Sequence, residues 1–257
     1  MPRLTILVPA VPVSPWLAET LHSIKGQTYQ DWQVFLILDG ENAGNRELAS
    51  ILPADRVRVL NTPSQPSYPS GSRNVGLEHC DTELVALCDA DDLCEPTRFE
   101  KQVAEFDRNP DLGALGTWAR RFQSTTGEDL GPQHCPSDPE KLARTLLWFN
   151  PMTASSMMMR TQLVKDLGLF NTAAVRIEDY DMWLRILGNA QIAAVPEELL
   201  RYRIHNAQHS TGKLFGVQTA LIRRSKLGAA RRLGRSVPRI WAQHAAWVGW
   251  QLAHGRW

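Results

Sequence analysis

The densest group of chemically reactive side chains in this sequence is Asp89-Ala90-Asp91-Asp92, which follows an apolar run at 84–88. Neighbouring carboxylates repel one another, so an empty acidic cluster of this kind is unfavourable. A divalent cation relieves the repulsion, and Mg²⁺ or Mn²⁺ needs only one or two protein carboxylates besides phosphate and water. The cluster therefore indicates metal-assisted chemistry on a phosphorylated substrate. A solvated acidic turn is the alternative, because Asp also favours turns and helix caps.

The elements around this cluster predict a parallel sheet. Continuously apolar strands alternate with helical patterns up to residue 110, which is typical of strands covered by helices on both faces. The expected strands are 4–8, 34–38, 57–60 and 84–88, and the expected helices are 17–26, 47–52, 97–109 and 70–79, the last with an N-cap at Ser70. Ligands of such sheets bind beyond the carboxyl ends of the strands. Two of these ends carry carboxylates, at Asp39 and at the acidic cluster.

The second half of the sequence is less regular. Strands are expected at 112–117, 155–159, 192–195 and 199–203, and helices at 139–148, 161–167 and 177–187. The stretch 127–137 is the most loop-like. Beyond residue 213 we expect two helical segments that are separated near Ser236-Val237-Pro238.

The formal net charge of +1 hides an acidic body and a basic end. Residues 199–257 contain 11 Lys and Arg and no acidic residue, against 17 basic and 27 acidic residues in 1–198. The last 45 residues also contain Trp241, Trp247, Trp250 and Trp257. Basic side chains with interleaved Trp favour contact with an anionic membrane surface. Packing of these helices on the acidic body, or a homodimer contact, is the alternative, and no nucleic-acid-binding module accompanies the charge.

Composition excludes several classes of protein. A chain of 257 residues with 43% apolar residues can build the core of one large α/β domain and is not globally disordered. Apolar runs stay shorter than the roughly 18–20 residues of a transmembrane helix, and we expect no signal peptide. The four cysteines form no CxxC pair, so we expect reduced, buried thiols in a cytoplasmic protein rather than a disulfide framework or a zinc site.

Further motifs follow one another in a specific order. They are Pro9 at the end of the first strand, Asp39-Gly40 at the end of the second, Gly71-Ser72-Arg73-Asn74-Val75-Gly76-Leu77, the acidic cluster followed by Pro96, Asn150-Pro151, Gly168-Leu169-Phe170-Asn171, Glu178-Asp179-Tyr180-Asp181, and Tyr202-Arg203-Ile204-His205. Each is weak by itself. Together, across roughly residues 3–212, they resemble the motifs of family 2 glycosyltransferases with the GT-A fold.

The resemblance implies an α/β protein of the GT-A fold, with a Rossmann-like, mostly parallel central sheet flanked by helices. It implies an inverting, metal-dependent glycosyltransferase with a UDP- or GDP-sugar donor and a saccharide or glycolipid acceptor, in cell-surface polysaccharide assembly. Residues 1–212 would form the catalytic domain, with a nucleotide-binding half at 1–110 and an acceptor-binding half at 111–212. Residues 213–257 lie beyond the part that resembles the family; their basic and Trp residues favour a C-terminal helical extension that is peripheral on the inner face of the membrane.

The resemblance also assigns residues to the nucleotide sugar. Pro9, Asp39 and Arg73 would contact the nucleotide, with Asp39 at the base, and Asp89 would lie near the ribose. Two departures weaken this part of the match. The family often has Thr-Tyr-Asn after the first proline, where this sequence has Ala10-Val11-Pro12, and two aspartates after the second strand, where this sequence has one.

Three further residues would carry the reaction. Asp91 would hold Mn²⁺ or Mg²⁺ against the diphosphate, and His205 would reach the metal or the diphosphate from the other side. Positive charge there stabilises the leaving group. Asp179 would take the proton of the acceptor hydroxyl, and one direct displacement with one base inverts the anomeric centre. Taken alone, Asp179 is typical of an acid that complements a helix dipole, and His205 of a packed histidine.

Other interpretations stay open at this point. A metal-dependent phosphatase of the DxD type normally carries its acidic motif on the first strand, whereas here it follows the fourth. A catalytically inactive glycan-binding module is disfavoured because Asp91 and Asp179 are both present. Within the motifs, Glu178 and Asp181 are expected to be supporting or surface residues. Arg201 and Arg203 are expected to face the substrate diphosphate.

Overall fold

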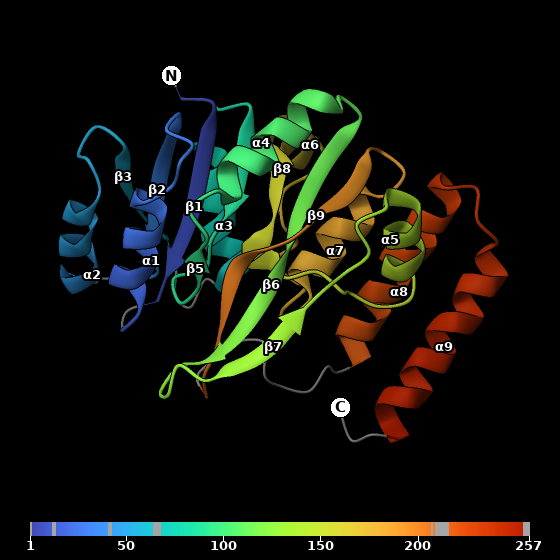
Figure 1. Ribbon diagram of the computed structural model, residues 1–257. Coiled ribbons are helices and arrows are strands. Elements are labelled where there is room, and N and C mark those ends of the chain that lie inside the picture. Colours follow the sequence, from blue (N-terminus) through green and yellow to red (C-terminus); the bar gives the residue numbers. More distant parts are fainter. Residues whose placement is uncertain are drawn as a thin grey trace.

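The computed structural model describes residues 2–11, 14–40, 43–63, 68–206, 208 and 216–253. Within these ranges the chain forms one nine-stranded sheet with helices on both faces (Figure 1). The strand order is β3-β2-β1-β4-β8-β6-β9-β5, and β7 pairs with β6 outside this path. The sheet therefore places the end of the chain's first half next to the strands of its second half.

The first half of the sheet is parallel, as its apolar runs predict. Its strands are β1 (Leu4–Ala10), β2 (Trp32–Leu38), β3 (Val57–Asn61) and β4 (Leu84–Leu87), and all three pairings among them are parallel. The helices that connect or follow them are α1 (Leu17–Lys25), α2 (Ala43–Leu48), α3 (Tyr68–Glu78) and α4 (Arg98–Arg108). A short 3₁₀ turn, Ala49–Ile51, extends α2. Because the strands are parallel, their carboxyl ends meet at one edge.

The second half of the sheet is mixed. Strand β8 (Met158–Arg160) runs antiparallel to both β4 and β6 (Leu112–Gln123), and β6 runs parallel to β9 (Gln191–Ile204). The two-residue strand β5 (Leu93–Cys94) pairs antiparallel with β9. Through this last pairing, the segment directly after the acidic cluster is held against the strand that ends next to His205.

Two expectations about these strands were wrong. The loop-like stretch 127–137 contains β7 (Asp129–Gln133), which forms a hairpin with β6. The separate strands expected at 192–195 and 199–203 are one strand, β9, whose register shifts at Pro196-Glu197. A β-bulge accommodates a proline that cannot donate to the ladder, and it also breaks the apolar alternation by which a continuous strand is recognised.

Two serine positions also differ from expectation. Helix α3 begins at Tyr68, so Ser70 lies inside the helix and is not its N-cap. The strand expected at 155–159 begins only at Met158, after a 3₁₀ turn at Ala154–Ser156. The hydroxyl of Ser156 donates to the Thr153 carbonyl at 2.8 Å, and such local side-chain bonds compete with strand pairing.

The core consists of two apolar layers, one on each face of the sheet. Adjacent β1 residues point to opposite faces, so Ile6 belongs to one layer and Leu7 to the other. The layer that contains Leu7 is covered by α5 (Pro139–Leu146), α6 (Thr161–Asp166), α7 (Glu178–Ile186), α8 (Gly216–Arg232) and α9 (Val237–Ala253). All four cysteines are free and buried, as expected, with two in each layer.

The two C-terminal helices pack on the body of the protein. Helix α8 lies against α7, and α9 lies against α8 at the end of the molecule opposite β3 (Figure 1). Ile222 of α8 and Trp247 of α9 are buried in the same layer as Trp183 of α7. The packing alternative for the basic end is thus realised in the described residues, and Trp257 lies outside them. No described helix is both long and apolar enough to cross a membrane.

Candidate active site

The acidic cluster divides into two accessible carboxylates and one buried one. The Asp89 and Asp91 side chains keep 32% and 28% of their exposure, whereas Asp92 is fully buried. Asp92 accepts a hydrogen bond from the backbone N–H of Arg203 at 2.9 Å. Burial, and then the neighbouring Asp91, raise the Asp92 pKa well above its ordinary value. Asp92 therefore anchors the loop to β9, and only Asp89 and Asp91 are available to a ligand.

Arg203 braces the same loop from the other side. Its Nε donates to the Asp91 carbonyl at 2.7 Å, and its guanidinium pairs with Glu19 at 2.8 Å. The side chain is buried over the rings of Trp16 and Phe122. The expectation that Arg203 faces the diphosphate was wrong, because these partners engage its donors. Arg201 lies over the Phe122 ring at 4.7 Å.

Asp91 and His205 meet although 114 residues separate them. His205 Nε2 lies 2.8 Å from Asp91 Oδ2, and the ring packs at 4.2 Å against Trp16 of the loop before α1. Burial, and then Asp89, raise the Asp91 pKa, whereas the contact with His205 opposes the shift. Within the described ranges no group of three His, Cys, Asp or Glu side chains could hold a metal by itself. The protein thus offers a two-donor set, one carboxylate and one imidazole.

Arg73 connects this edge of the sheet to α7. The side chain projects from α3, is 3% exposed, and pairs with Asp89 at 2.8 Å and Glu178 at 3.5 Å. Burial disfavours its positive charge, but the nearby carboxylates of Asp89, Glu178 and Asp179 outweigh this effect and raise its pKa. Arg73 is thus a buried bridge rather than a surface residue. Glu178 is a buried support for it, not a surface acid.

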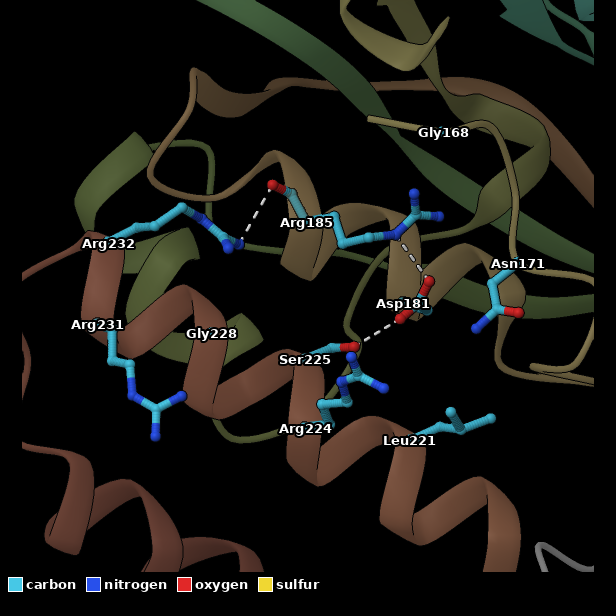
Figure 2. Close-up of a pocket in the computed structure, with 10 residues that line it drawn as sticks. All are labelled: Gly168, Asn171, Asp181, Arg185, Leu221, Arg224, Ser225, Gly228, Arg231 and Arg232. Carbon is cyan, nitrogen blue, oxygen red and sulfur yellow. Dashed lines mark hydrogen bonds and ion pairs between the residues drawn. The ribbon is translucent and has the colours of Figure 1, made fainter. Parts of the chain in front are cut away.

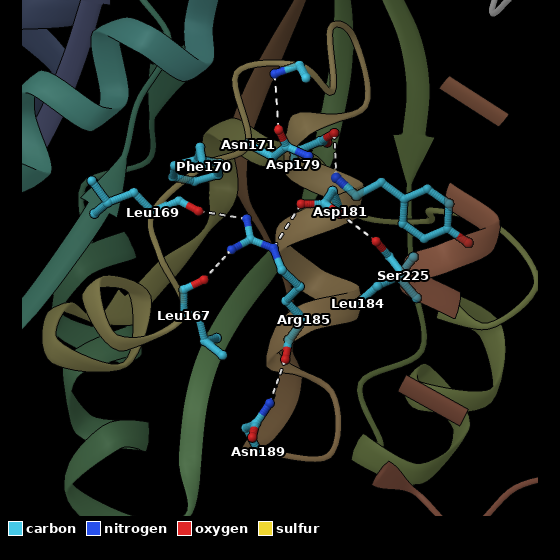
Figure 3. A network of polar contacts seen from close by, with 12 residues as sticks. Leu167, Leu169, Phe170, Asn171, Asp179, Asp181, Leu184, Arg185, Asn189 and Ser225 are labelled. Atoms are coloured by element: carbon cyan, nitrogen blue, oxygen red, sulfur yellow. Dashed lines mark hydrogen bonds and ion pairs between the residues drawn. The ribbon is translucent and has the colours of Figure 1, made fainter. Parts of the chain in front are cut away.

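Asp179 is the second residue of α7, and neutral donors hold its carboxylate in place (Figure 3). The Asn150 side-chain amide donates to its Oδ2 at 3.0 Å, and the Tyr180 backbone N–H lies 2.7 Å from its Oδ1. Burial, and then the charge of Glu178, raise the Asp179 pKa to about 6. A carboxylate with this pKa is still mostly ionised at neutral pH and is a stronger base than an ordinary aspartate.

Pro9 and Asp39 lie at the same carboxyl edge, further toward β3. Pro9 is opposite Ile37 in the pairing of β1 with β2, and the Asp39 backbone N–H donates to the Ala10 carbonyl at 3.0 Å. The Asp39 carboxylate accepts a hydrogen bond from the Thr62 hydroxyl at 2.8 Å. The parallel sheet thus aligns both residues with Asp89, and Thr62, one residue beyond β3, orients the Asp39 side chain.

Sequence reasoning missed several residues that orient this site. Asn74, the neighbour of Arg73, exchanges two hydrogen bonds with the backbone of Phe170, at 2.8 and 2.9 Å, which ties α3 to the segment before α7. The Ser155 hydroxyl accepts the Asp89 backbone N–H at 2.9 Å. Asn74 and Asn150 lie in the quoted motifs, so a polar side chain within a motif was a usable signal, whereas Ser155 was expected only as part of a strand. Trp16 carried no such signal.

A separate cavity of about 510 Å³ lies between α7 and α8 (Figure 2) and includes none of the predicted site residues. Asp181 and Arg185, one turn apart on α7, pair at the wall of the cavity at 2.8 Å, and Arg232 of α8 donates to the Leu187 and Leu184 carbonyls at the end of α7. Arg185 also holds the carbonyls of Leu167 and Leu169 (Figure 3). Arg224 and Arg231 line the cavity and form no ion pair within the described part of the chain. This cavity therefore carries excess positive charge.

Comparison with known proteins decides the family. Residues 5–175, about two thirds of the chain, match the family model described as "Glycosyl transferase family 2". The chain belongs to glycosyltransferase family 2. The predicted family and enzyme class are therefore confirmed, and neither the phosphatase nor the inactive glycan-binding module is favoured.

Named relatives of this glycosyltransferase occur in polysaccharide and O-antigen biosynthesis. The amylovoran biosynthesis glycosyltransferase AmsE of Erwinia amylovora is 26% identical over 189 residues, which cover 73% of this chain and 70% of AmsE. The O-antigen biosynthesis glycosyltransferase WbnJ of Escherichia coli is 29% identical over 197 residues, which cover 73% of this chain and 74% of WbnJ. An uncharacterized glycosyltransferase of Haemophilus influenzae is 26% identical, over 82% of this chain and 68% of that protein.

Solved structures confirm the GT-A fold. S. aureus TarS 1–349, in complex with UDP-GlcNAc, superposes with a TM-score of 0.71 at 16% identity, over 90% of this chain and 69% of that one. The mannosyltransferase PcManGT of Pyrobaculum calidifontis, in complex with GDP-Man and Mn²⁺, gives a TM-score of 0.61 at 18% identity, over 98% and 75% of the two chains. The glycosyltransferase shares the mostly parallel sheet and flanking helices of these proteins.

Proposed function

We propose that this glycosyltransferase moves a sugar from a nucleotide sugar to an acceptor hydroxyl with inversion, and that Asp179 is its general base. The observation that carries the proposal is the buried chain of charges from Asp89 through Arg73 to Glu178, next to Asp179. The Arg73 guanidinium thus lies between the sheet edge where the nucleotide is expected and the Glu178-Asp179 end of α7, where the pKa of Asp179 is raised. Glu178 is engaged by Arg73, which leaves Asp179 as the base and supports a single displacement.

The donor end of the site is assigned to the carboxyl edge of β1, β2 and β4. Pro9, Asp39, Arg73 and Asp89 contact the nucleotide sugar, with Asp39 near the base and Asp89 near the ribose. UDP- and GDP-sugars are the proposed donors, since TarS and PcManGT are described in complex with UDP-GlcNAc and GDP-Man. Residues 1–110 supply this half of the site, and residues 111–212 supply the acceptor half with Asp179.

Asp91 and His205 fit a divalent cation, Mn²⁺ or Mg²⁺. One carboxylate and one imidazole are a small donor set, but Mg²⁺ typically keeps waters and substrate phosphates as its other ligands. Burial, and then the charge of Asp89, raise the pKa of Asp91, and a bound cation would stabilise its ionised form. The bound cation would neutralise charge that develops on the leaving diphosphate. Arg203 and Asp92 fix the loop that presents Asp91.

The acceptor is proposed to be a saccharide or a lipid-linked saccharide in cell-surface polysaccharide assembly. The roles of AmsE in amylovoran biosynthesis and of WbnJ in O-antigen biosynthesis support this class. We place the enzyme in the cytoplasm, at the inner face of the membrane. The residues that support this location are Arg224 and Arg231 at the cationic cavity and the exposed rings of Trp241 and Trp250. A homodimer through α9 is the second candidate for the same exposed rings.

Ligand binding and turnover of three proteins test the proposal. The wild type should show a thermal shift with UDP or GDP that increases with Mn²⁺. Asp91→Asn should lose the part of the thermal shift that depends on Mn²⁺, because one of the two proposed protein ligands of the metal is weakened. Asp179→Asn should keep the shift and lose sugar transfer. Transfer by Asp179→Asn at the wild-type rate would refute the assigned base, and turnover of a simple phosphate ester without any nucleotide shift would favour a phosphatase.

A further inference from the structure

Two cysteines bracket the acidic loop. Cys88 follows β4 directly and Cys94 ends β5, so the segment from Asp89 to Asp92 lies between them. Their sulfur atoms are 3.5 Å apart although neither residue is in a disulfide. Cys88 is 0% exposed and Cys94 is 5% exposed, so both are buried and Cys94 is the less enclosed of the two. The pair occupies the base of the loop that carries Asp91.

Cys94 also lies beside a buried arginine. Arg98 is 0% exposed, and no carboxylate of the described residues lies within ion-pair distance of it. Its Nη1 donates to Cys94 Sγ at 3.1 Å, its Nη2 to the Leu87 carbonyl at 2.9 Å, and its Nε to Gln102. A buried cation is strongly disfavoured without an anion beside it. The Cys94 thiolate is the group in position to be that anion.

The protonation of the two thiols agrees with this geometry. The hydrogen bond from the Cys88 thiol, and then the charge and hydrogen bond of Arg98, lower the Cys94 pKa to about 6 against the opposing effect of burial. The same hydrogen bond, together with burial, raises the Cys88 pKa. At neutral pH the pair is therefore one thiolate and one thiol. The thiolate is the form that reacts with oxidants.

We propose that Cys88 and Cys94 form a reversible disulfide that controls the acidic loop. A peroxide is the oxidant. The Cys94 thiolate attacks one oxygen of hydrogen peroxide and the O–O bond breaks. The attacked oxygen stays on sulfur as a sulfenic acid, and the other oxygen leaves as hydroxide, which takes a proton from solvent to become water. The Cys88 sulfur then displaces the sulfenic oxygen, which leaves as a second water with the Cys88 proton. In sum, two thiols are oxidised to one disulfide and one hydrogen peroxide is reduced to two waters.

The disulfide must change the loop between the two sulfurs. A covalent S–S bond is about 2.05 Å long, so the sulfurs approach by about 1.5 Å. The loop cannot follow freely, because the Thr20 hydroxyl holds the Asp92 carbonyl at 2.8 Å and Ser155 holds the Asp89 N–H. Oxidation also removes the anion beside Arg98. Resting on the proposed role of Asp89 and Asp91, we expect the disulfide form to bind nucleoside diphosphate and Mn²⁺ less tightly.

The test measures the bond and its effect separately. Wild type, Cys88→Ser and the control Cys135→Ser are treated with hydrogen peroxide, digested after alkylation, and analysed by mass spectrometry. Cys135 is also buried, but it packs in the other apolar layer. A Cys88–Cys94 linked peptide is expected in wild type and Cys135→Ser and not in Cys88→Ser. Cys88→Ser leaves the contact of Arg98 with Cys94 intact, so it is expected to fold.

The second readout is UDP or GDP binding with Mn²⁺. Peroxide should weaken it at least about tenfold in wild type and Cys135→Ser, dithiothreitol should restore it, and Cys88→Ser should keep its affinity. Oxidation of Cys80 or Cys135 without the linked peptide would overturn the proposal, and so would equal loss of affinity in Cys88→Ser. If the reduced wild type bound no nucleoside diphosphate, the proposed function would fail, whereas the linked peptide would still decide whether the disulfide forms.

Discussion

Arg73 and Asp89 form a 2.8 Å ion pair in which the guanidinium is 3% exposed, and this pair joins α3 to the carboxyl end of β4. The same guanidinium reaches Glu178 on α7. One buried cation therefore fixes the relative position of the donor edge and the helix that carries Asp179. The proposed catalytic geometry therefore depends on this contact between residues 1–110 and 111–212, not on either segment alone.

Replacing Arg73 should damage stability and activity together. Arg73→Ala leaves Glu178 and Asp89 without their buried cation, and removing one partner of a buried pair costs about 3–5 kcal/mol. Denaturant unfolding measures this loss. Arg108→Ala, which removes an arginine whose side chain is 70% exposed and paired with Glu105, should cost no more than about 1 kcal/mol. Equal stability of the two variants would show that the bridge does not hold the halves together.

The pH dependence of transfer should report the ionisation of Asp179. Only the carboxylate can accept the acceptor proton, so kcat/KM should fall about tenfold per pH unit below a pKa of about 6. Initial rates from pH 4.5 to 8 at saturating Mn²⁺ give this profile. A profile that stays flat from pH 5 to 8 would exclude Asp179 as the titrating base.

The same pKa has a consequence for stability. Because the folded-state pKa of Asp179 lies above the ordinary 3.8, the folded protein binds the proton more tightly than the unfolded chain. The resulting stabilisation is complete below about pH 3.8 and is lost as the pH rises through about 6. Asp179→Asn should remove this pH dependence, so the variant should gain more stability over wild type at pH 7 than at pH 4.5. Thermal melts of both proteins at the two pH values measure the difference.

Lys226 should make the protein more stable as the pH rises. The side chain is 1% exposed, donates to the Trp148 carbonyl at 2.7 Å, and lies 4.9 Å from the Trp247 ring. Desolvation by burial lowers its pKa to about 7. The folded state therefore holds fewer protons than the unfolded chain between about pH 7 and 10.5, and stability should rise by up to about 1.4 kcal/mol per pH unit there. Lys226→Met should abolish this rise, which unfolding at pH 7 and 9 would detect.

Binding to anionic vesicles should depend on the cavity between α7 and α8. If the cavity receives lipid phosphate, Arg224→Ala with Arg231→Ala should weaken cosedimentation with phosphatidylglycerol vesicles about 30-fold, from about 1 kcal/mol per arginine. The matched control, Arg223→Ala with Arg239→Ala, removes the same charge from exposed positions that do not line the cavity. Equal loss in both double variants would indicate diffuse attraction, and no binding by wild type would exclude membrane contact through this surface.

The parallel half of the fold was predictable because β1, β2 and β4 consist mostly of consecutive apolar residues; β3, which Arg58 interrupts, was recognised from its short Val-x-Val-Leu pattern. The second half was less so, since Pro196 interrupts the apolar pattern of β9 without ending the strand. Arg203 shows the same limit at the site. Its charge suggested contact with substrate, but its position in the register of β9 directs it into the acidic loop. A charge in a sequence does not reveal whether its partner is a ligand or the protein.

The contact between Asp91 and His205 could not be predicted from any local sequence pattern. No spacing rule connects residues 114 positions apart, and only the resemblance to a family with both motifs suggested that they meet. Burial of Lys226 and Trp247 was not suggested by any pattern. Because α8 and α9 mix apolar, basic and aromatic residues, their sequence fitted a membrane surface as well as it fitted the protein core.

The position of Lys226 also limits how the C-terminal helices can be studied. Its ammonium lies 5.7 Å from the ring of Tyr180, the residue after Asp179, and Ile222 fills the apolar layer under α7. Deleting residues 213–257 would uncover α7, whose first turn carries the proposed base Asp179. Loss of activity in a shortened enzyme would therefore indicate a damaged α7 rather than lost membrane attachment. Support of α7 and membrane attachment can be separated only by single-residue changes on the outer surface of this segment.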